Sequence, residues 1–177
     1  MNGPLTPVLA LTIAVAALTP AAAAPSPGRD QIARWTADLD AAETWARAGD
    51  VARAGETYAR VLAELPTNGG PALLRARGLD GVGDTYRLRG ESAAAVDPYR
   101  QAAALWEELL GPRQPRLAVT LHNLGAVLLA TDRPGEARSV LEHALTIWCD
   151  SAITRDEAEN TRRLLARIGS GPATVTR

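Results

Sequence analysis

The chain has 177 residues, which is enough for one domain with a modest core, and it is 46% hydrophobic and 22% charged. Its formal net charge of −1 gives no indication of a nucleic-acid-binding surface. A single cysteine, Cys149, excludes an internal disulfide framework. We expect its thiol to be partly buried and structural, with an intermolecular disulfide as the alternative.

The first residues have the features of a secretory signal. A mostly apolar run covers residues 8–18, and Thr19-Pro20 and four alanines follow it and offer a small-residue cleavage site. We therefore expect residues 1–23 to be a signal peptide and the protein to be exported, either to a periplasm or outside the cell. An uncleaved membrane anchor and an unrelated leader stay open as alternatives, although Pro7 and Pro20 argue against the anchor.

The segments that flank the expected domain are rich in turn-forming residues. Residues 24–29 contain the run Pro-Ser-Pro-Gly, which is typical of a linker. Residues 169–177 are expected to form a disordered tail. The folded domain is therefore expected to cover residues 30–168.

One pattern of six positions occurs three times in this domain. The first copy precedes the second by 41 residues at every position, and the second precedes the third by 42. A fixed period of this size predicts a repeat solenoid, in which each unit buries its apolar face only against its neighbours. The copies are Ala42, Trp45, Gly49, Ala54, Tyr58 and Val61; Gly83, Tyr86, Gly90, Ala95, Tyr99 and Ala102; and Gly125, Leu128, Asp132, Ala137, Leu141 and Ala144.

Each copy contains two amphipathic segments with helical periodicity around a polar turn. In the first copy, Gly49 suits the end of one helix and Asp50 suits the N-cap of the next. A further amphipathic segment at residues 155–168 has a charged outer face, as expected of a helix that caps a solenoid. The sequence therefore predicts an all-α fold, a right-handed α-solenoid of three helix-turn-helix pairs with a C-terminal capping helix.

The repeated positions resemble the tetratricopeptide repeat pattern, which combines a Leu-Gly-like pair, aromatic residues, a Gly-Asp turn, alanines and a proline. The 41- to 42-residue spacing, with Leu-Gly-Pro-Arg-Gln-Pro at residues 110–115 before the third copy, resembles the kinesin-light-chain variant. The resemblance implies repeats at about residues 35–68, 76–109 and 118–151, in a bacterial exported member of this family.

The resemblance also implies that the first helix of each pair lines a concave face. Asn123 matches the position at which kinesin-light-chain-like repeats use Asn to hold a peptide backbone. The mixed charges there fit either ion pairing on a solvated face or a groove for a peptide with at least one basic side chain. The predicted groove residues are Asp40, Glu43, Arg47, Arg77, Asp80, Asp84, Arg87, His122 and Asn123.

No set of residues predicts catalysis. Gly81-Val82-Gly83 lacks the third glycine and the preceding strand of a dinucleotide-binding motif. His122, His143 and Cys149 are spaced poorly for a shared metal site. We therefore expect no enzyme activity, cofactor or metal, and an adaptor that binds a protein or peptide. We expect no nucleic-acid partner and no membrane contact beyond the possible anchor. The alternative is a self-associating structural or assembly subunit of an envelope complex.

Overall fold

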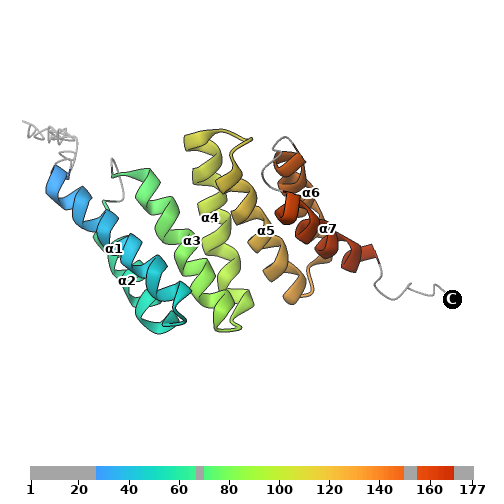
Figure 1. The fold of residues 1–177 in the computed structure, drawn as a ribbon, viewed down its shortest axis with the longest axis horizontal. Helices are drawn as coiled ribbons and strands as arrows, with labels where there is room; N and C mark the ends of the chain where they lie inside the picture. Colours follow the sequence, from blue (N-terminus) through green and yellow to red (C-terminus); the bar gives the residue numbers. More distant parts are fainter. Residues whose placement is uncertain (1–26, 67–69, 150–154, 170–177) are drawn as a thin grey trace, which may run out of the picture.

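The computed structural model describes residues 27–66, 70–149 and 155–169, and within these ranges the chain forms seven α-helices and no strand. Each helix packs against the next in a row that runs from α1 to α7 (Figure 1). The expected all-α solenoid is confirmed. The helices are α1 (Arg29–Arg47), α2 (Val51–Glu64), α3 (Ala72–Leu88), α4 (Ser92–Leu110), α5 (Pro115–Ala130), α6 (Pro134–Cys149) and α7 (Arg155–Gly169).

The first helix of each pair begins a few residues before the expected repeat boundary. Helix α1 begins at Arg29, the last residue of the expected linker, and α3 begins at Ala72. Helix α5 begins at Pro115, whose missing N–H is no loss because the first turn of a helix leaves its N–H groups unused. The expected signal peptide, residues 24–26 of the linker and residues 170–177 of the tail lie outside the described residues.

The turn inside each helix pair has the same backbone geometry in all three pairs. Its last residue has a positive φ, which is +88° at Gly49, +78° at Gly90 and +57° at Asp132. Glycine adopts this conformation without strain, whereas an aspartate adopts it at a cost. The next residue then donates its N–H across the helix end over 2.9 Å in each pair: Asp50 to the Trp45 carbonyl, Glu91 to Tyr86 and Arg133 to Leu128.

The small residues of the repeat lie where the two helices of a pair touch. Ala54, Ala95 and Ala137 on the second helices have no exposed surface. A Cβ atom on Gly83 would lie 2.7 Å from the Tyr99 ring, and one on Gly125 would lie 2.5 Å from Leu141. The side chain of the second helix therefore rests directly on glycine backbone, a contact that offsets the cost of about 1 kcal/mol for glycine inside a helix.

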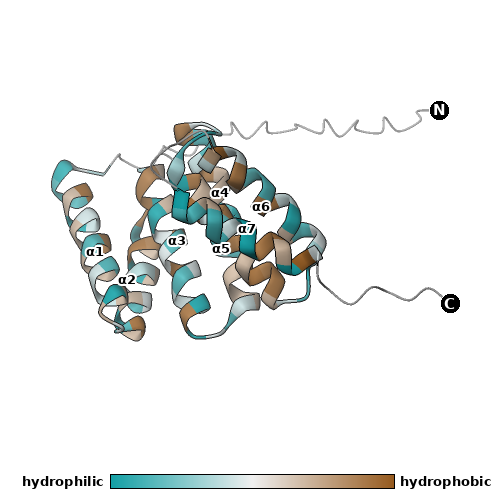
Figure 2. Ribbon diagram, turned by 45° about the vertical axis from the view of Figure 1, so that its right-hand side comes forward, coloured by the Kyte–Doolittle hydropathy of each residue, from teal (hydrophilic) through white to brown (hydrophobic). Residues whose placement is uncertain are grey.

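Hydrophobic side chains fill the spaces between successive helices, and each helix in Figure 2 carries both hydrophobic and hydrophilic residues. Helix α7 buries Ala158 and Thr161 and exposes its charged residues. Cys149 is exposed, so the expectation of a partly buried thiol was wrong. It ends α6, and the preceding Trp148 occupies the buried position. No helix in the described ranges is both long enough and apolar enough to cross a membrane.

Candidate functional site

A cavity of about 290 Å³ opens between α1, α3 and α5, and we call it the groove. Tyr58 from α2 reaches it against Gly81 of α3, where a Cβ atom would lie 2.3 Å from the tyrosine ring. Seven of the nine residues predicted from the sequence line the groove: Glu43, Arg47, Arg77, Asp80, Asp84, Arg87 and Asn123. The structure thus brings together charged residues from three first helices.

Asp40 and Glu43 of α1 are paired with arginines. Arg77 Nη2 donates to Asp40 Oδ1 over 2.6 Å and to Glu43 Oε1 over 2.8 Å, which joins α3 to α1. The second carboxylate oxygen of Glu43 lies 3.3 Å from Arg47. Asp40 lies outside the lining of the groove and is 62% exposed. The two contacts of Arg77 thus use acids of α1 to hold α3 against α1.

Asp80 is a buried link between three helices. Its Oδ2 accepts a hydrogen bond from Trp106 Nε1 of α4 over 2.7 Å, and its Oδ1 accepts one from Thr120 Oγ1 of α5 over 2.8 Å. Burial raises the pKa of Asp80 to about 6, against the lowering effect of these two hydrogen bonds. Both oxygens serve the fold, so Asp80 joins helices at the base of the groove.

Asp84 is held by one oxygen only. Its Oδ1 accepts from the Tyr99 hydroxyl over 2.7 Å, from Arg87 Nη2 over 3.1 Å and from Asn123 Nδ2 over 3.3 Å. Burial and the negative charge of Asp84 raise the pKa of Tyr99, so its hydroxyl keeps its proton and donates. Asp84 Oδ2 has no hydrogen-bond partner within the described residues, and the side chain is 39% exposed. The fold fixes this carboxylate and leaves one oxygen open.

The orientation of Asn123 follows from its neighbour. An ionised carboxylate only accepts hydrogen bonds, so the amide nitrogen of Asn123 faces Asp84 and the amide oxygen faces away. The resemblance implied a carboxamide that holds both the N–H and the C=O of a peptide. In the structure the contact with Asp84 uses one of those functions, and the oxygen remains as an acceptor.

Sequence reasoning missed several residues that line the groove, namely Ala46, Tyr58, Leu88 and Arg116. Arg116 lies over the Trp106 ring, 5.4 Å from its centroid, and 3.8 Å from carboxylate oxygens of Glu43 and Asp80. It lies in the first turn of α5, outside the repeated positions. Tyr58 belongs to a repeated position that the pattern assigned to packing. Its ring packs against Gly81 and also lines the groove.

His122 lies away from the groove, against α7. Its Nδ1 is 2.8 Å from Thr161 Oγ1, and because that hydroxyl donates to the Glu157 carbonyl, the hydrogen lies on His122 Nδ1. Burial, with the positive charge of Arg87, lowers the pKa of His122. The predicted groove position was wrong for this residue, because the capping helix covers the end of the row. Across the described ranges, no group of three or more His, Cys, Asp or Glu residues is placed to hold a metal ion.

Two family models, both described as tetratricopeptide repeat, match this chain at residues 75–116 and 99–150. The chain is also 33% identical over 98 residues to Protein KINESIN LIGHT CHAIN-RELATED 3 of Arabidopsis thaliana. That match covers 55% of this chain and 15% of the relative, so the chain spans a small part of that protein.

Solved structures share the fold. The crystal structure of BtubC (BKLC) from P. vanneervenii has a TM-score of 0.69 at 20% identity, covering 80% of this chain and 57% of that chain. The Yersinia enterocolitica type III secretion chaperone SycD, in complex with a peptide of the translocator YopD, has a TM-score of 0.60 at 16% identity. That match covers 80% of this chain and 95% of the chaperone. At these identities the likeness concerns the fold.

Proposed function

Because residues 75–150 carry tetratricopeptide repeats, we propose that this chain binds a segment of a partner protein in the groove between α1, α3 and α5. The fold is typical of protein-protein interaction modules and not of enzymes. The groove carries the proposal, because its walls combine charged side chains fixed by the fold with the exposed apolar residues Leu88 and Val119. Such a surface offers both polar register and apolar contact to an extended chain.

A structure of the same fold supports peptide binding. The SycD chaperone is solved with a peptide of YopD, so a helical array of this kind accommodates a bound peptide. The match covers 80% of our chain and 95% of the chaperone. This support extends to the class of ligand only, since the two chains are 16% identical.

Filling the groove tests the proposal. Val119 is 44% exposed and lines the groove, so Val119→Trp fills space there without entering the core. Ala104 is exposed on α4 and lines no part of the groove, so Ala104→Trp is the matched control. Random dodecapeptides displayed on phage and selected on the full-length chain should lose binding to Val119→Trp and keep it to Ala104→Trp. Equal binding to both variants, or no selected peptide, contradicts the proposal.

Self-association is a second candidate function, which three exposed leucines favour. Leu73 lies at the start of α3, and Leu109 and Leu110 lie at the end of α4, with exposed fractions of 47%, 40% and 41%. Because α3 and α4 pack against each other and are joined by a turn of only residues 89–91, the start of α3 and the end of α4 lie at the same end of that pair. Light scattering on the full chain decides this: a dimer that Leu109→Arg dissociates supports it, and a monomer at high concentration contradicts it.

We further propose that the protein is a bacterial exported protein. The support is the apolar run at residues 8–18 and the alanines at residues 21–24, all of which lie outside the described part of the chain. N-terminal sequencing of the protein purified from each cell fraction provides the test. A chain outside the cytoplasm that begins near Ala24 supports cleaved export, whereas a cytoplasmic chain that keeps Met1 contradicts it.

A further inference from the structure

The groove contains two hydrogen-bond acceptors that the fold leaves unused. Asp84 Oδ2 and Asn123 Oδ1 have no hydrogen-bond partner in the part of the chain that the structure describes. The two side chains are joined through Asn123 Nδ2 and Asp84 Oδ1 at 3.3 Å, so their remaining oxygens belong to one connected unit. A carboxylate oxygen and an amide oxygen on two hydrogen-bonded side chains offer acceptors to a ligand group with several N–H donors.

The other acids of the groove are already occupied. Glu43 contacts Arg77 with one oxygen and Arg47 with the other. Asp80 accepts from Trp106 and Thr120 with its two oxygens. Asp84 is therefore the acid of the groove lining, among the described residues, that keeps an oxygen for a ligand.

The arginines of the groove are also paired, which argues against an anionic ligand. Arg47 and Arg77 lie 3.3 and 2.8 Å from oxygens of Glu43. Arg87 lies 3.1 Å from Asp84, and Arg116 lies 3.8 Å from Asp80. An anion would compete with the carboxylate that already lies within 3.8 Å of each guanidinium, whereas a cation at Asp84 Oδ2 leaves every one of these pairs in place.

We propose that the groove takes a basic side chain of the partner segment, arginine or lysine, on the acceptor pair of Asp84 Oδ2 and Asn123 Oδ1. This inference rests on the proposed peptide-binding function and specifies the ligand. The Tyr99 hydroxyl and Arg87 hold the carboxylate in place before the ligand arrives, so little conformational freedom is lost on binding. A guanidinium suits the site best, because its fork presents two parallel N–H donors.

The test begins with the ligand. An oriented library of N-acetylated, C-amidated decapeptides, screened on the full-length chain, should show enrichment of arginine or lysine at one position. The best peptide is then resynthesised with citrulline in place of arginine, which keeps the shape of the side chain and removes its charge. We expect the citrulline peptide to bind about ten- to a hundredfold more weakly, as for loss of a hydrogen bond to a charged group.

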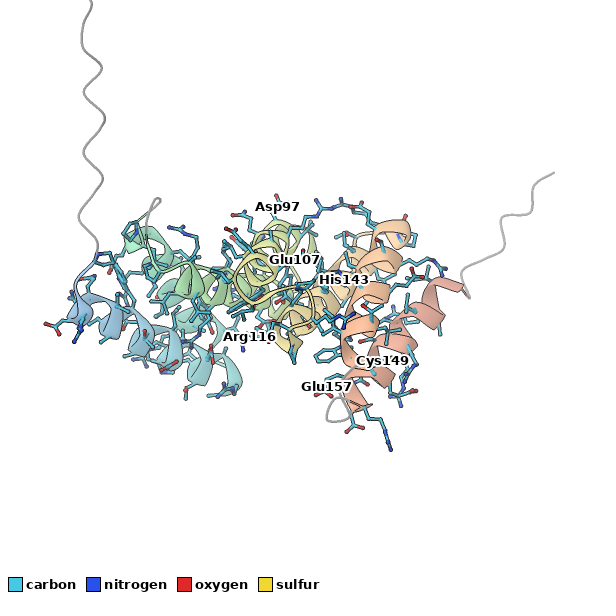
Figure 3. All side chains as sticks on the ribbon, turned by 90° about the horizontal axis from the view of Figure 1, so that it is seen from above. Asp97, Glu107, Arg116, His143, Cys149 and Glu157 are labelled. Carbon is cyan, nitrogen blue, oxygen red and sulfur yellow. The ribbon has the colours of Figure 1, made fainter. Side chains whose placement is uncertain are left out.

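Two protein variants of equal charge change locate the contact. Asp84→Asn removes the charge at the acceptor pair and keeps an oxygen for Tyr99 and Arg87, so we expect the same ten- to hundredfold loss for the arginine peptide. Asp97→Asn is the matched control, because Asp97 is exposed on α4 and projects from the opposite face to Arg116 (Figure 3). Its affinity should stay within about twofold of that of the unmodified chain.

The outcomes separate this inference from the proposed function. Enrichment of acidic residues, or equal affinity for arginine and citrulline peptides, overturns the inference and leaves peptide binding standing. An Asp97→Asn loss as large as that of Asp84→Asn also overturns it, because a general charge effect then explains both. Absence of any bound peptide overturns the proposed function and the inference with it. The citrulline comparison needs no altered protein, so it tests the requirement for a basic side chain even when Asp84→Asn unfolds.

Discussion

The two junctions between successive helix pairs use equivalent positions and pack them differently. Helix α2 meets α3 at the first junction, where a Cβ atom on Gly55 would lie 2.6 Å from Thr85 and a cavity of about 240 Å³ opens beside them. Helix α4 meets α5 at the second, where the equivalent residues are Val96 and Val127, which are 3% and 1% exposed. The same period therefore yields one junction with a notch and one that is filled.

The polar contact across the first junction is also more exposed to solvent than the one across the second. At the first junction Arg77 reaches Asp40, which is 62% exposed, so solvent weakens the pair. At the second, Asp80 accepts a hydrogen bond from Thr120, and the two residues are only 13% and 1% exposed. We infer that the first helix pair is held less firmly than the rest, because in a solenoid each pair depends on its contacts with neighbours.

Replacing Val96 at the second junction with glycine, the residue found at position 55 of the first, should cause the largest loss of stability. Val96→Gly removes a buried side chain and places glycine inside α4, and we expect a loss of about 2.5–4 kcal/mol in the free energy of unfolding. Urea unfolding followed by circular dichroism measures it. Ala104→Gly, at an exposed position of the same helix, is expected to cost about 1 kcal/mol. A Val96→Gly loss no greater than this control contradicts the view that Val96 fills the junction.

The second junction should respond to pH. The pKa of Asp80 is raised by burial from 3.8 to about 6 in the folded protein, so the folded state holds this proton more tightly than the unfolded state. Stability should therefore rise as the pH falls through 6 towards 4, by about 3 kcal/mol at most from this group. Asp80→Asn removes the titrating group. The contact with α5 survives, because the Asn amide donates to Thr120 Oγ1 while that hydroxyl donates to the Arg116 carbonyl at 3.2 Å.

The measurement is the difference between the two unfolding free energies across the pH range. Asp80→Asn should be the more stable protein at pH 8, and the unmodified chain should gain on it as the pH falls. Subtracting one curve from the other cancels the other carboxylates, which titrate in both proteins. Parallel curves would show that Asp80 does not titrate in this range.

Asp80 and Asp84 show how far the sequence predicts this molecule. The repeat period and the small residues predict the helix pairs and their close contacts, because those depend on neighbours within one unit. The two aspartates lie four residues apart on one helix, and the sequence assigns both to the groove. Their different roles come from side chains far along the chain: Trp106 and Thr120 enclose Asp80, and Asn123 engages one oxygen of Asp84. The position of His122 likewise depended on where α7 docks.

The smallest expected effect is a salt-dependent loss of stability at the first junction. Arg77→Met keeps the aliphatic part of the side chain and removes the charge that joins α3 to Asp40 and Glu43. We expect a loss of about 0.5–1 kcal/mol at low ionic strength, which should shrink towards zero in 1 M NaCl, where charges are screened within about 3 Å.

Hydrogen exchange should place this loss in α1 and α2 and leave α5 and α6 protected, because the ion pairs of Arg77 with described residues all join it to α1. Arg138→Met is the control, since the ion pair that Arg138 makes in the described part of the chain, with Glu142 at 3.9 Å, lies within α6. A loss that persists in 1 M NaCl would show that Arg77 contributes through packing, and the first junction would then be held by the same kind of contact as the second. Equal loss of protection in α5 and α6 would show that the row unfolds as one unit, so the difference between the junctions would not set which pair opens first.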